Sequence, residues 1–292
     1  MTQPKNYSGY IMAAFATLTV GAGITASTYL ITIPVFQSQA IRYGVGAIIL
    51  YFLARPERSK NLKFSAKDKF YLFVVSAFGL VGFSVASLEA LKSATAPSVA
   101  IIIGAAPVLI AIIGPFIENR RPTIRPIISA GIVLAGTTII EGASKAGLAG
   151  ILWAIFALFG DASFSIFSVP LVKKVGPYTL SFWTTSIASI SLIIIHFIFE
   201  PSKPPNTFTH QEIIALVFQG LFVTVGAFVA WYIGLARIRV ELVGLFPGLI
   251  PVGALVSALI LGQNGGNPLA DVIGIALLGV GLYFGAIRSV GQ

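Results

Sequence analysis

Long apolar stretches separated by short polar segments run along the whole chain. A helix needs about 20 apolar residues to cross the hydrocarbon core of a bilayer. Because a segment in lipid must satisfy its own backbone hydrogen bonds, we expect each stretch to be a helix. The pattern predicts ten spans, near residues 8–27, 34–53, 69–91, 97–117, 123–140, 148–172, 178–198, 211–236, 241–262 and 269–287.

The composition supports a membrane protein. Of the 292 residues, 56% are hydrophobic and only 10% are charged, whereas a soluble domain carries about 25% charged residues. So few charges cannot cover a soluble surface. We therefore expect an all-α, multi-pass membrane protein whose surroundings are a lipid bilayer.

The basic residues predict the orientation. With the N-terminus placed in the cytoplasm, the inside segments carry fifteen Lys and Arg residues, while the outside segments carry only Lys92, Lys145 and Lys203. This bias follows the positive-inside rule and places both termini in the cytoplasm. It also explains the net charge of +9 without a nucleic-acid partner.

The two halves of the chain resemble each other at an offset of 144 residues around two proline-containing spans. The matched pairs are Leu91 and Leu235, Gly104 and Gly248, and Pro107 and Pro251. We predict two five-helix repeats, residues 1–141 and 142–292. Because five is odd, the second copy is inverted, an architecture typical of secondary transporters. The alternative is a duplication that only enlarged a static bundle.

Pro107 and Pro251 lie near the middle of their spans. A proline inside a helix removes one backbone hydrogen bond and kinks the helix, and neighbouring helices can satisfy the freed carbonyl. We interpret both prolines as hinges or as bends that shape a central cavity. Kinked helices in a static bundle are the alternative.

The region "APSVAIIIGAAPVLIAIIGPFIENRRP", followed by "ISAGIVLAGTTII", resembles one repeat of a known family. Its Pro107, Glu118, Gly131 and Gly136 stand at the family's usual positions. In the second half Pro251, Gly274 and Gly279 match, while Gln263 replaces the usual acidic residue. The pattern is similar to the drug/metabolite transporter superfamily, in particular its ten-helix exporters with two EamA-type repeats.

The resemblance implies an exporter of the bacterial inner (plasma) membrane that carries amino acids or other metabolites. Its cavity would be built mainly from the first, third, fourth and ninth helices and their mates. The sequence is also similar to the aromatic amino acid exporters of this group.

Charged residues inside a membrane are costly and point to function. Arg42 lies about 12 Å into the second span at 1.5 Å per residue, where it either binds a substrate carboxylate or forms a structural ion pair with Glu89. Arginine suits both roles. At the predicted cytoplasmic end of the fourth span, Glu118 is expected to pair with Arg120 and Arg121.

Asp161 lies midway along the sixth span and forms one polar stripe with Ser165 and Ser168. The stripe should face the interior of the bundle. There the carboxylate could bind a substrate amine, carry a proton or bond to a neighbouring helix. Glu89, near the outer end of the third span, is a second candidate to bind substrate or to respond to a pH gradient. Proton coupling therefore remains open.

Aromatic residues gather on single faces of several spans, including Phe78, Phe164, Trp231 and Tyr232. A cavity lined by such side chains would suit apolar or aromatic substrates. Contact with lipid is the alternative for each of them.

No cysteine, phosphate-binding GxxxxGK[ST] loop, HExxH or GxSxG motif occurs. We therefore expect no metal site, no cofactor and no enzymatic activity. The leading hypothesis is a secondary transporter that exports small metabolites, above all neutral or aromatic amino acids, by alternating access. The alternatives are an organophosphate or nucleotide-sugar exchanger and an intramembrane enzyme. The sequence leaves the oligomeric state open and is compatible with a monomer.

Overall fold

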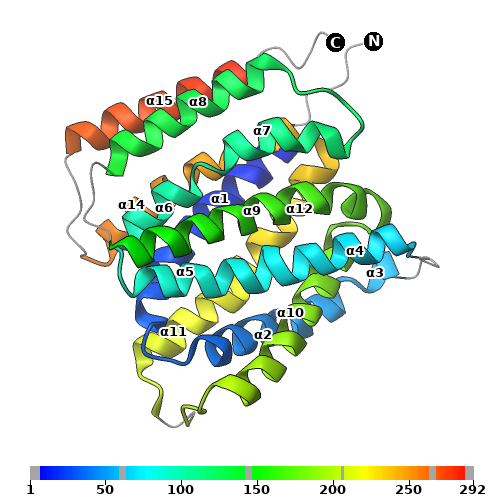
Figure 1. Cartoon of the computed structure of the whole chain (residues 1–292), viewed down its shortest axis with the longest axis vertical. Coiled ribbons are helices and arrows are strands. Elements are labelled where there is room, and N and C mark those ends of the chain that lie inside the picture. Colours follow the sequence, from blue (N-terminus) through cyan, green and yellow to red (C-terminus); the bar gives the residue numbers. More distant parts are fainter. Residues whose placement is uncertain (1–6, 59–63, 142–146, 205–206, 263–267, 287–292) are drawn as a thin grey trace.

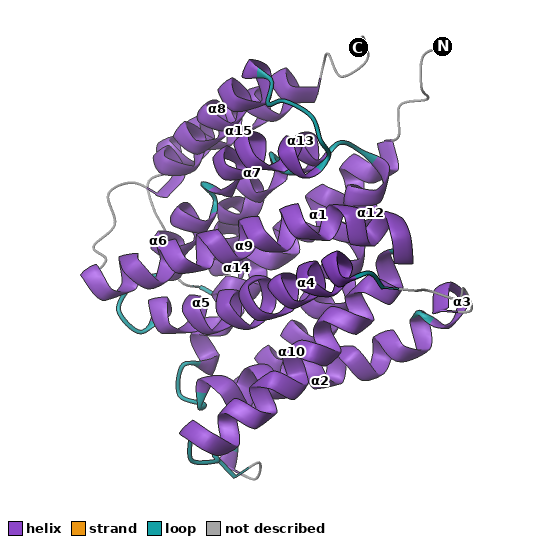
Figure 2. Cartoon of the chain, turned by 45° about the vertical axis from the view of Figure 1, so that its right-hand side comes forward, coloured by secondary structure: helices purple, strands orange, loops and turns teal. Residues whose placement is uncertain are grey.

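A computed structural model describes residues 7–58, 64–141, 147–204, 207–262 and 268–286, and within these ranges it contains helices and loops but no strand (Figure 2). Gln263 and Lys145 lie outside the described residues. The helices are α1 (Tyr7–Ser27), η1 (Thr28–Leu30), α2 (Val35–Leu53), α3 (Arg55–Arg58), α4 (Ala66–Val74), η2 (Val75–Gly82), α5 (Phe83–Leu91), α6 (Ala96–Ile103), α7 (Ala106–Ile117), α8 (Ile124–Glu141), α9 (Leu148–Val175), α10 (Pro177–Phe199), α11 (His210–Phe218), η4 (Gln219–Ala227), α12 (Phe228–Arg237), α13 (Val240–Val243), η5 (Phe246–Leu249), α14 (Ile250–Ile260) and α15 (Pro268–Ala286).

Helical segments occupy each range that the sequence predicts as a span. Within the described residues, seven segments are long and apolar enough to cross a membrane: Tyr7–Leu30, Ala66–Leu91, Ser98–Ile117, Leu148–Val175, Pro177–Phe199, His210–Arg237 and Val240–Ile260. The remaining three ranges hold α2, α8 and α15; α8 and α15 contain the shorter apolar stretches Ile124–Gly136 and Ile273–Phe284. The chain is thus a multi-pass membrane protein, while ten spans and cytoplasmic termini stay predictions.

Two helix pairs form opposite ends of the molecule. In Figure 1, α8 and α15 lie side by side at the top, α2 and α10 lie at the bottom, and the other long helices fill the space between them. Each pair joins equivalent helices of the two halves. The long helices run roughly side by side, as expected for a membrane bundle.

The α2–α10 pair is antiparallel and capped reciprocally. The Glu200 carboxylate, after the end of α10, accepts hydrogen bonds from the backbone N–H groups of Phe36 and Gln37 at the start of α2. The Glu57 carboxylate, beyond the end of α2, accepts a 2.8 Å bond from the Thr179 N–H at the start of α10. A carboxylate at a helix N-terminus satisfies free N–H groups and the helix dipole. The same bond, made in both directions, fits an inverted relation between the halves.

The other symmetric pair, α8 and α15, is also antiparallel. The Arg125 Nε at the start of α8 donates to the Phe284 carbonyl near the end of α15. Their backbones approach closely, because a Cβ atom added to Gly136 would lie 2.8 Å from the Gly274 carbonyl oxygen. Small residues allow such contacts between membrane helices.

The third and eighth spans are built alike. Both begin with a capping box, made by Ser65 with Asp68 and by Thr209 with Glu212, which satisfies two N–H groups at each helix start. Both then change to a π-helix, η2 and η4, at positions 144 residues apart. Such π segments are rare and often lie at functional sites.

The fourth and ninth spans are both interrupted at the predicted prolines. Helix α6 ends at Ile103 and α7 begins at Ala106, with Pro107 in its first turn. In the second half, the short η5 precedes α14, and Pro251 lies in the first turn of α14. The two interruptions meet, since a Cβ on Gly104 would lie 3.3 Å from Pro251 Cγ. The prolines therefore start new helical segments instead of bending continuous helices.

Helices α1 and α14 cross with their backbones in contact. A Cβ on Gly21 would lie 2.0 Å from the Ile250 carbonyl oxygen, and one on Gly253 would lie 2.2 Å from the Leu18 carbonyl oxygen. No side chain can move aside to relieve these contacts. This crossing fixes α14 against α1 next to the centre of the molecule.

At the end predicted to face the cytoplasm, ion pairs join the two halves. Glu118 pairs with Lys173 and with Arg120, and Arg120 also donates to Glu241 at the start of α13. The expected bond between Glu118 and Arg120 is confirmed. For the expected partner Arg121 the described part of the chain shows no ion pair, and Lys173 of α9 takes that place.

This network shifts the pKa values of its members. The pKa of Arg120 is raised, chiefly by its hydrogen bonds to Glu241 and against the effect of burial. Burial opposes ionisation of Glu118, but hydrogen bonds from Lys173 and Arg120 outweigh it and hold the pKa of this carboxyl below its ordinary value of 4.5. The network therefore favours the charged carboxylate.

We expect Gly253→Ala to destabilise the fold, because the new methyl group would collide with the α1 backbone. Overpacking of this kind costs about 1–3 kcal/mol, which outweighs the gain of about 1 kcal/mol from replacing glycine within a helix. Thermal unfolding in detergent measures the effect. The matched control is Gly279→Ala in α15, where an added Cβ meets nothing within 4 Å. Equal unfolding temperatures for the two variants would contradict the close crossing.

We expect Glu118→Gln to lower stability at neutral pH but not under acid conditions. A carboxyl whose pKa is lowered on folding stabilises the protein above its unfolded pKa, and the effect disappears as pH falls through the folded pKa. The difference in unfolding temperature between wild type and variant should therefore shrink below about pH 4.5. A difference that stayed constant from pH 7 to pH 3 would contradict an ionic role.

Candidate functional site: a central cavity between the two halves

A small cavity lies at the centre of the bundle, where helices of both halves meet. Its volume is about 40 Å³, and its walls come from α1, η2, α5, α9, η4, α12, η5 and α14. The lining residues are Ala16, Thr17, Val20, Gly79, Phe83, Asp161, Phe164, Ala227, Phe228, Trp231, Pro247 and Ile250. These helices belong to the first, third, sixth, eighth and ninth predicted spans. The sixth and eighth spans are the second-half equivalents of the first and third.

Asp161 contributes the one ionisable side chain among the described residues that line the cavity. Its Oδ2 atom is buried and has no hydrogen-bond partner. The alternative of a bond to a neighbouring helix is thus not realised for this oxygen. The rest of the predicted stripe is buried deeper on α9, where the Ser168 hydroxyl donates to the Phe164 carbonyl. A carboxylate oxygen without a partner is costly in such surroundings.

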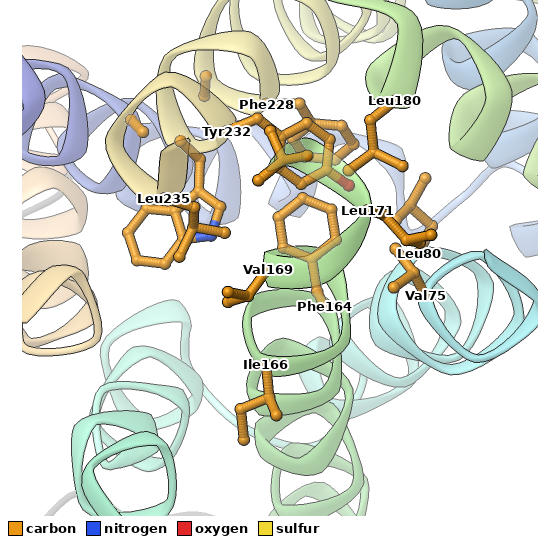
Figure 3. Close-up of a cluster of buried hydrophobic side chains, with 14 of the residues drawn as sticks. Val75, Leu80, Phe164, Ile166, Val169, Leu171, Leu180, Phe228, Tyr232 and Leu235 are labelled. Carbon is orange, nitrogen blue, oxygen red and sulfur yellow. The ribbon is translucent and has the colours of Figure 1, made fainter. Parts of the chain in front are cut away.

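Four aromatic residues, Phe83, Phe164, Phe228 and Trp231, form part of the remaining wall. Figure 3 shows Phe164 of α9 directed at Phe228 and Tyr232 of α12. The Phe164 ring lies 5.1 Å from each of these rings, tilted against Phe228 and stacked on Tyr232. Glycine permits this arrangement, because a Cβ on Gly79 of η2 would lie 2.9 Å from the Phe164 Cα.

Of the two aromatic residues predicted on the eighth span, one lines the cavity and the other is buried behind the wall. Trp231 lines the cavity, and its indole Nε1 is buried without a hydrogen-bond partner. Tyr232 is fully buried behind Phe164 and receives a long hydrogen bond from Ser168. Trp231 is therefore a wall residue, whereas Tyr232 supports the wall.

Arg42 is buried but lies outside the cavity wall. Its guanidinium donates to Thr224 Oγ1 at 2.9 Å and to Gln39 Oε1 at 3.1 Å. It also lies over the Tyr43 ring, and its Cζ is 5.9 Å from the centre of the Phe228 ring. Arg42 therefore lies one aromatic ring away from the cavity.

Two predicted residues lie away from the cavity. Glu89 pairs with Lys92 one helical turn further along its own segment, so the proposed ion pair between Arg42 and Glu89 is wrong. Phe78 is 48% exposed on the outer surface of η2. Among the described residues, the π-helix presents Gly79 to the cavity in place of Phe78.

Several wall residues were not among the predicted site residues. Phe83 and Phe228 belong to aromatic groups that the sequence does show. Thr17, Gly79 and Ala227 carry no such signal, since small and weakly polar residues are common in every span. Pro247 is the first proline of "FPGLIP" and lies four residues before the predicted Pro251. This closeness was the sequence signal that could have identified Pro247.

The cavity is too small for a substrate of ordinary size. A volume near 40 Å³ holds a few water molecules at most, while small-molecule sites measure about 300–1,000 Å³. A metabolite could enter only after the surrounding helices separate.

Comparison with known proteins relates both halves to one family. Residues 7–141 and 148–286 each match the EamA-like transporter family. A solved crystal structure superposes with a TM-score of 0.79, 21% sequence identity and coverage of 97% of this chain and 98% of the other, which shows a shared fold.

Relatives are found in bacteria and archaea. The uncharacterized transporter YetK of Bacillus subtilis is 25% identical across 98% of this chain and 88% of its own length. The uncharacterized transporter YyaM of the same organism is 24% identical over 97% of this chain and 96% of its own. A transporter of Archaeoglobus fulgidus is 26% identical over 63% of this chain and 65% of its own. With both halves matched, the chain belongs to the EamA-like transporter family, within the drug/metabolite transporter superfamily.

Proposed function

We propose that this protein is a secondary transporter that exports small metabolites, with neutral or aromatic amino acids as substrates, across a bacterial inner membrane. The observation that carries the proposal is the central cavity. It lies between inverted halves, it is lined by helices of both, and it holds one unpaired carboxylate among aromatic walls. Membership of a transporter family supports the same reading.

Alternating access would use the two interrupted spans. The chain breaks at Gly104 and before Pro251 lie against each other, and Pro247 and Ile250 beside the second break form part of the cavity wall. Rocking of one half against the other would bend the chain at these breaks. Substrate would then meet the cavity first from one side and then from the other.

The residues have different roles in this proposal. Asp161 and Trp231 would contact the substrate, Phe164 would form the aromatic wall, and Tyr232 would hold Phe164 in place. Arg42 would meet a substrate carboxylate only after Phe228 moves aside. Phe78 and Glu89 receive no role, because neither reaches the cavity.

An organophosphate or nucleotide-sugar exchanger is less well supported. Such substrates carry two or more negative charges and need several cationic groups. The described cavity wall has no Lys or Arg and one Asp. A phosphate group would be repelled by that carboxylate.

We expect the purified protein in proteoliposomes to take up labelled neutral and aromatic amino acids above the level of empty liposomes. The panel should include acidic and basic amino acids and phosphorylated sugars, each with and without a pH gradient. If phosphorylated compounds exchange and amino acids do not, the alternative exchanger is correct. If no compound moves, the transporter proposal itself fails.

The same assay tests proton coupling through Asp161. Arg42 and Tyr232 lie behind Phe228 and Phe164, so Asp161 is the titratable group that faces the cavity in the described part of the chain. If it carries the proton, an imposed pH gradient should drive accumulation in the wild type and not in Asp161→Asn. Equal responses in both proteins would exclude this coupling route.

We expect Pro251→Ala to slow transport without unfolding the protein, because alanine restores an N–H donor at the break and stiffens the ninth span. The expected effect is a several-fold lower initial uptake rate with an unchanged half-saturating substrate concentration. Pro115→Ala, at a proline within α7 away from the break, is the matched control and should keep the wild-type rate. Equal rates for all three proteins would show that Pro251 is only a packing residue.

A further inference from the structure

Two residues of the cavity wall each carry a buried polar atom without a hydrogen-bond partner, one an acceptor and the other a donor. They are Asp161 of α9 and Trp231 of α12. The Asp161 Oδ2 accepts no hydrogen bond, and the Trp231 Nε1 donates none. Native proteins seldom leave two buried polar atoms of opposite kind without partners in one small space.

In the described part of the chain, no cationic side chain forms an ion pair with Asp161. Arg42 is held by Thr224 and Gln39 behind Phe228. A cation that pairs with this carboxylate would therefore come from outside the described part of the protein.

The aromatic wall favours an organic cation. Phe83, Phe164, Phe228 and Trp231 surround the cavity, and aromatic faces attract ammonium groups, tryptophan most strongly. The same rings offer an apolar surface to an uncharged side chain. A ligand with an ammonium group and an apolar body fits both properties.

The Trp231 indole places a second requirement on the ligand. An N–H group donates only, so its partner must be an acceptor. On the substrate this would be a carbonyl or carboxylate oxygen near the ammonium group. The two unpaired atoms, taken together, match the two polar groups of one small molecule.

We infer that Asp161 binds the ammonium group of the transported substrate and that the Trp231 indole N–H binds an oxygen acceptor on the same molecule. The inference rests on the proposed function and deepens it. It assigns substrate specificity to the ammonium group of the substrate. The negative charge of the substrate carboxylate is then not needed for binding. Compounds with an ammonium group but no carboxylate should therefore be carried, and carboxylates without an ammonium group should not.

Inhibition of labelled phenylalanine uptake by unlabelled analogues tests this inference in proteoliposomes. The analogues are phenylalaninamide, which keeps both the ammonium group and an oxygen acceptor, phenethylamine, which keeps only the ammonium group, and 3-phenylpropionate, which keeps only the carboxylate. We expect the first two to inhibit and the third to have no effect. Leucine, isoamylamine and 4-methylpentanoate form a parallel series for a site that prefers aliphatic side chains.

Two variants separate the two contacts. Asp161→Asn keeps the shape but removes the charge, and it should weaken every ammonium compound at least tenfold. Trp231→Phe keeps an aromatic face but removes the donor. It should weaken phenylalanine and phenylalaninamide by about tenfold, the effect of one hydrogen bond to a charged or strongly polar group, and leave phenethylamine inhibition unchanged.

The matched control is Ser129→Ala in α8, which removes another buried polar atom without a hydrogen-bond partner, here a hydroxyl away from the cavity. It should behave as the wild type. Elution volume and thermal unfolding in detergent show whether each variant is folded. If Asp161→Asn does not fold, the comparison of phenylalanine with phenethylamine in Trp231→Phe still tests the site.

Three results would overturn the inference while leaving transport intact. They are inhibition by 3-phenylpropionate as strong as by phenylalanine, unchanged inhibition in folded Asp161→Asn, and equal weakening of phenylalanine and phenethylamine in Trp231→Phe. Absence of uptake of both phenylalanine and leucine by the wild type would instead contradict the proposed function.

Discussion

The requirement that every backbone hydrogen bond be satisfied inside the bilayer governs this structure. Lipid offers no partner to an N–H or C=O group, so a helix can be interrupted only where protein covers the break. Here the interruptions at Gly104 and before Pro251 lie against each other at the boundary of the two halves. The same boundary contains the cavity. The interrupted backbone therefore lies where protein, and not lipid, surrounds it.

Close helix contacts hold this boundary together. The α1–α14 crossing at Gly21 and Gly253, and the approach of η2 to Phe164 at Gly79, both require residues without a side chain. A tight central contact means that a small displacement of one half must be passed to the other, because packed interiors deform little. Opening of the cavity should therefore involve whole helices and not single side chains.

The starts of the third and eighth spans, which lie at the two predicted membrane surfaces, are alike in architecture but differ in their side-chain bonds. Asp68 bonds to Lys174 at one end, and the equivalent Glu212 bonds to Thr32 and Lys203 at the other. The ion pairs of Glu118 and Glu241 are not repeated in the other half of the chain. The equivalent positions, 144 residues away, hold Gly262 and Pro97, which carry no charge. In the proposed alternating-access mechanism, these different bonds would give the two sides different free energies of opening.

The apolar pattern by itself determined the helices and their order, since a membrane span is recorded in the sequence as a long run of apolar residues. The offset of 144 residues likewise identified the positions of both breaks. Asp161, Phe164 and Trp231, which line the cavity, were predicted as site residues because of their charge or their place in an aromatic group. Only the tertiary structure decided which side of each helix faces the centre. It placed Phe78 outside and Gly79 inside, separated Arg42 from the cavity by one ring, and paired Glu89 with Lys92. The physical reason is that lipid and protein interior are both apolar, so hydrophobicity cannot distinguish a lipid-facing side chain from a buried one, and a π-helical turn changes the facing of every residue after it.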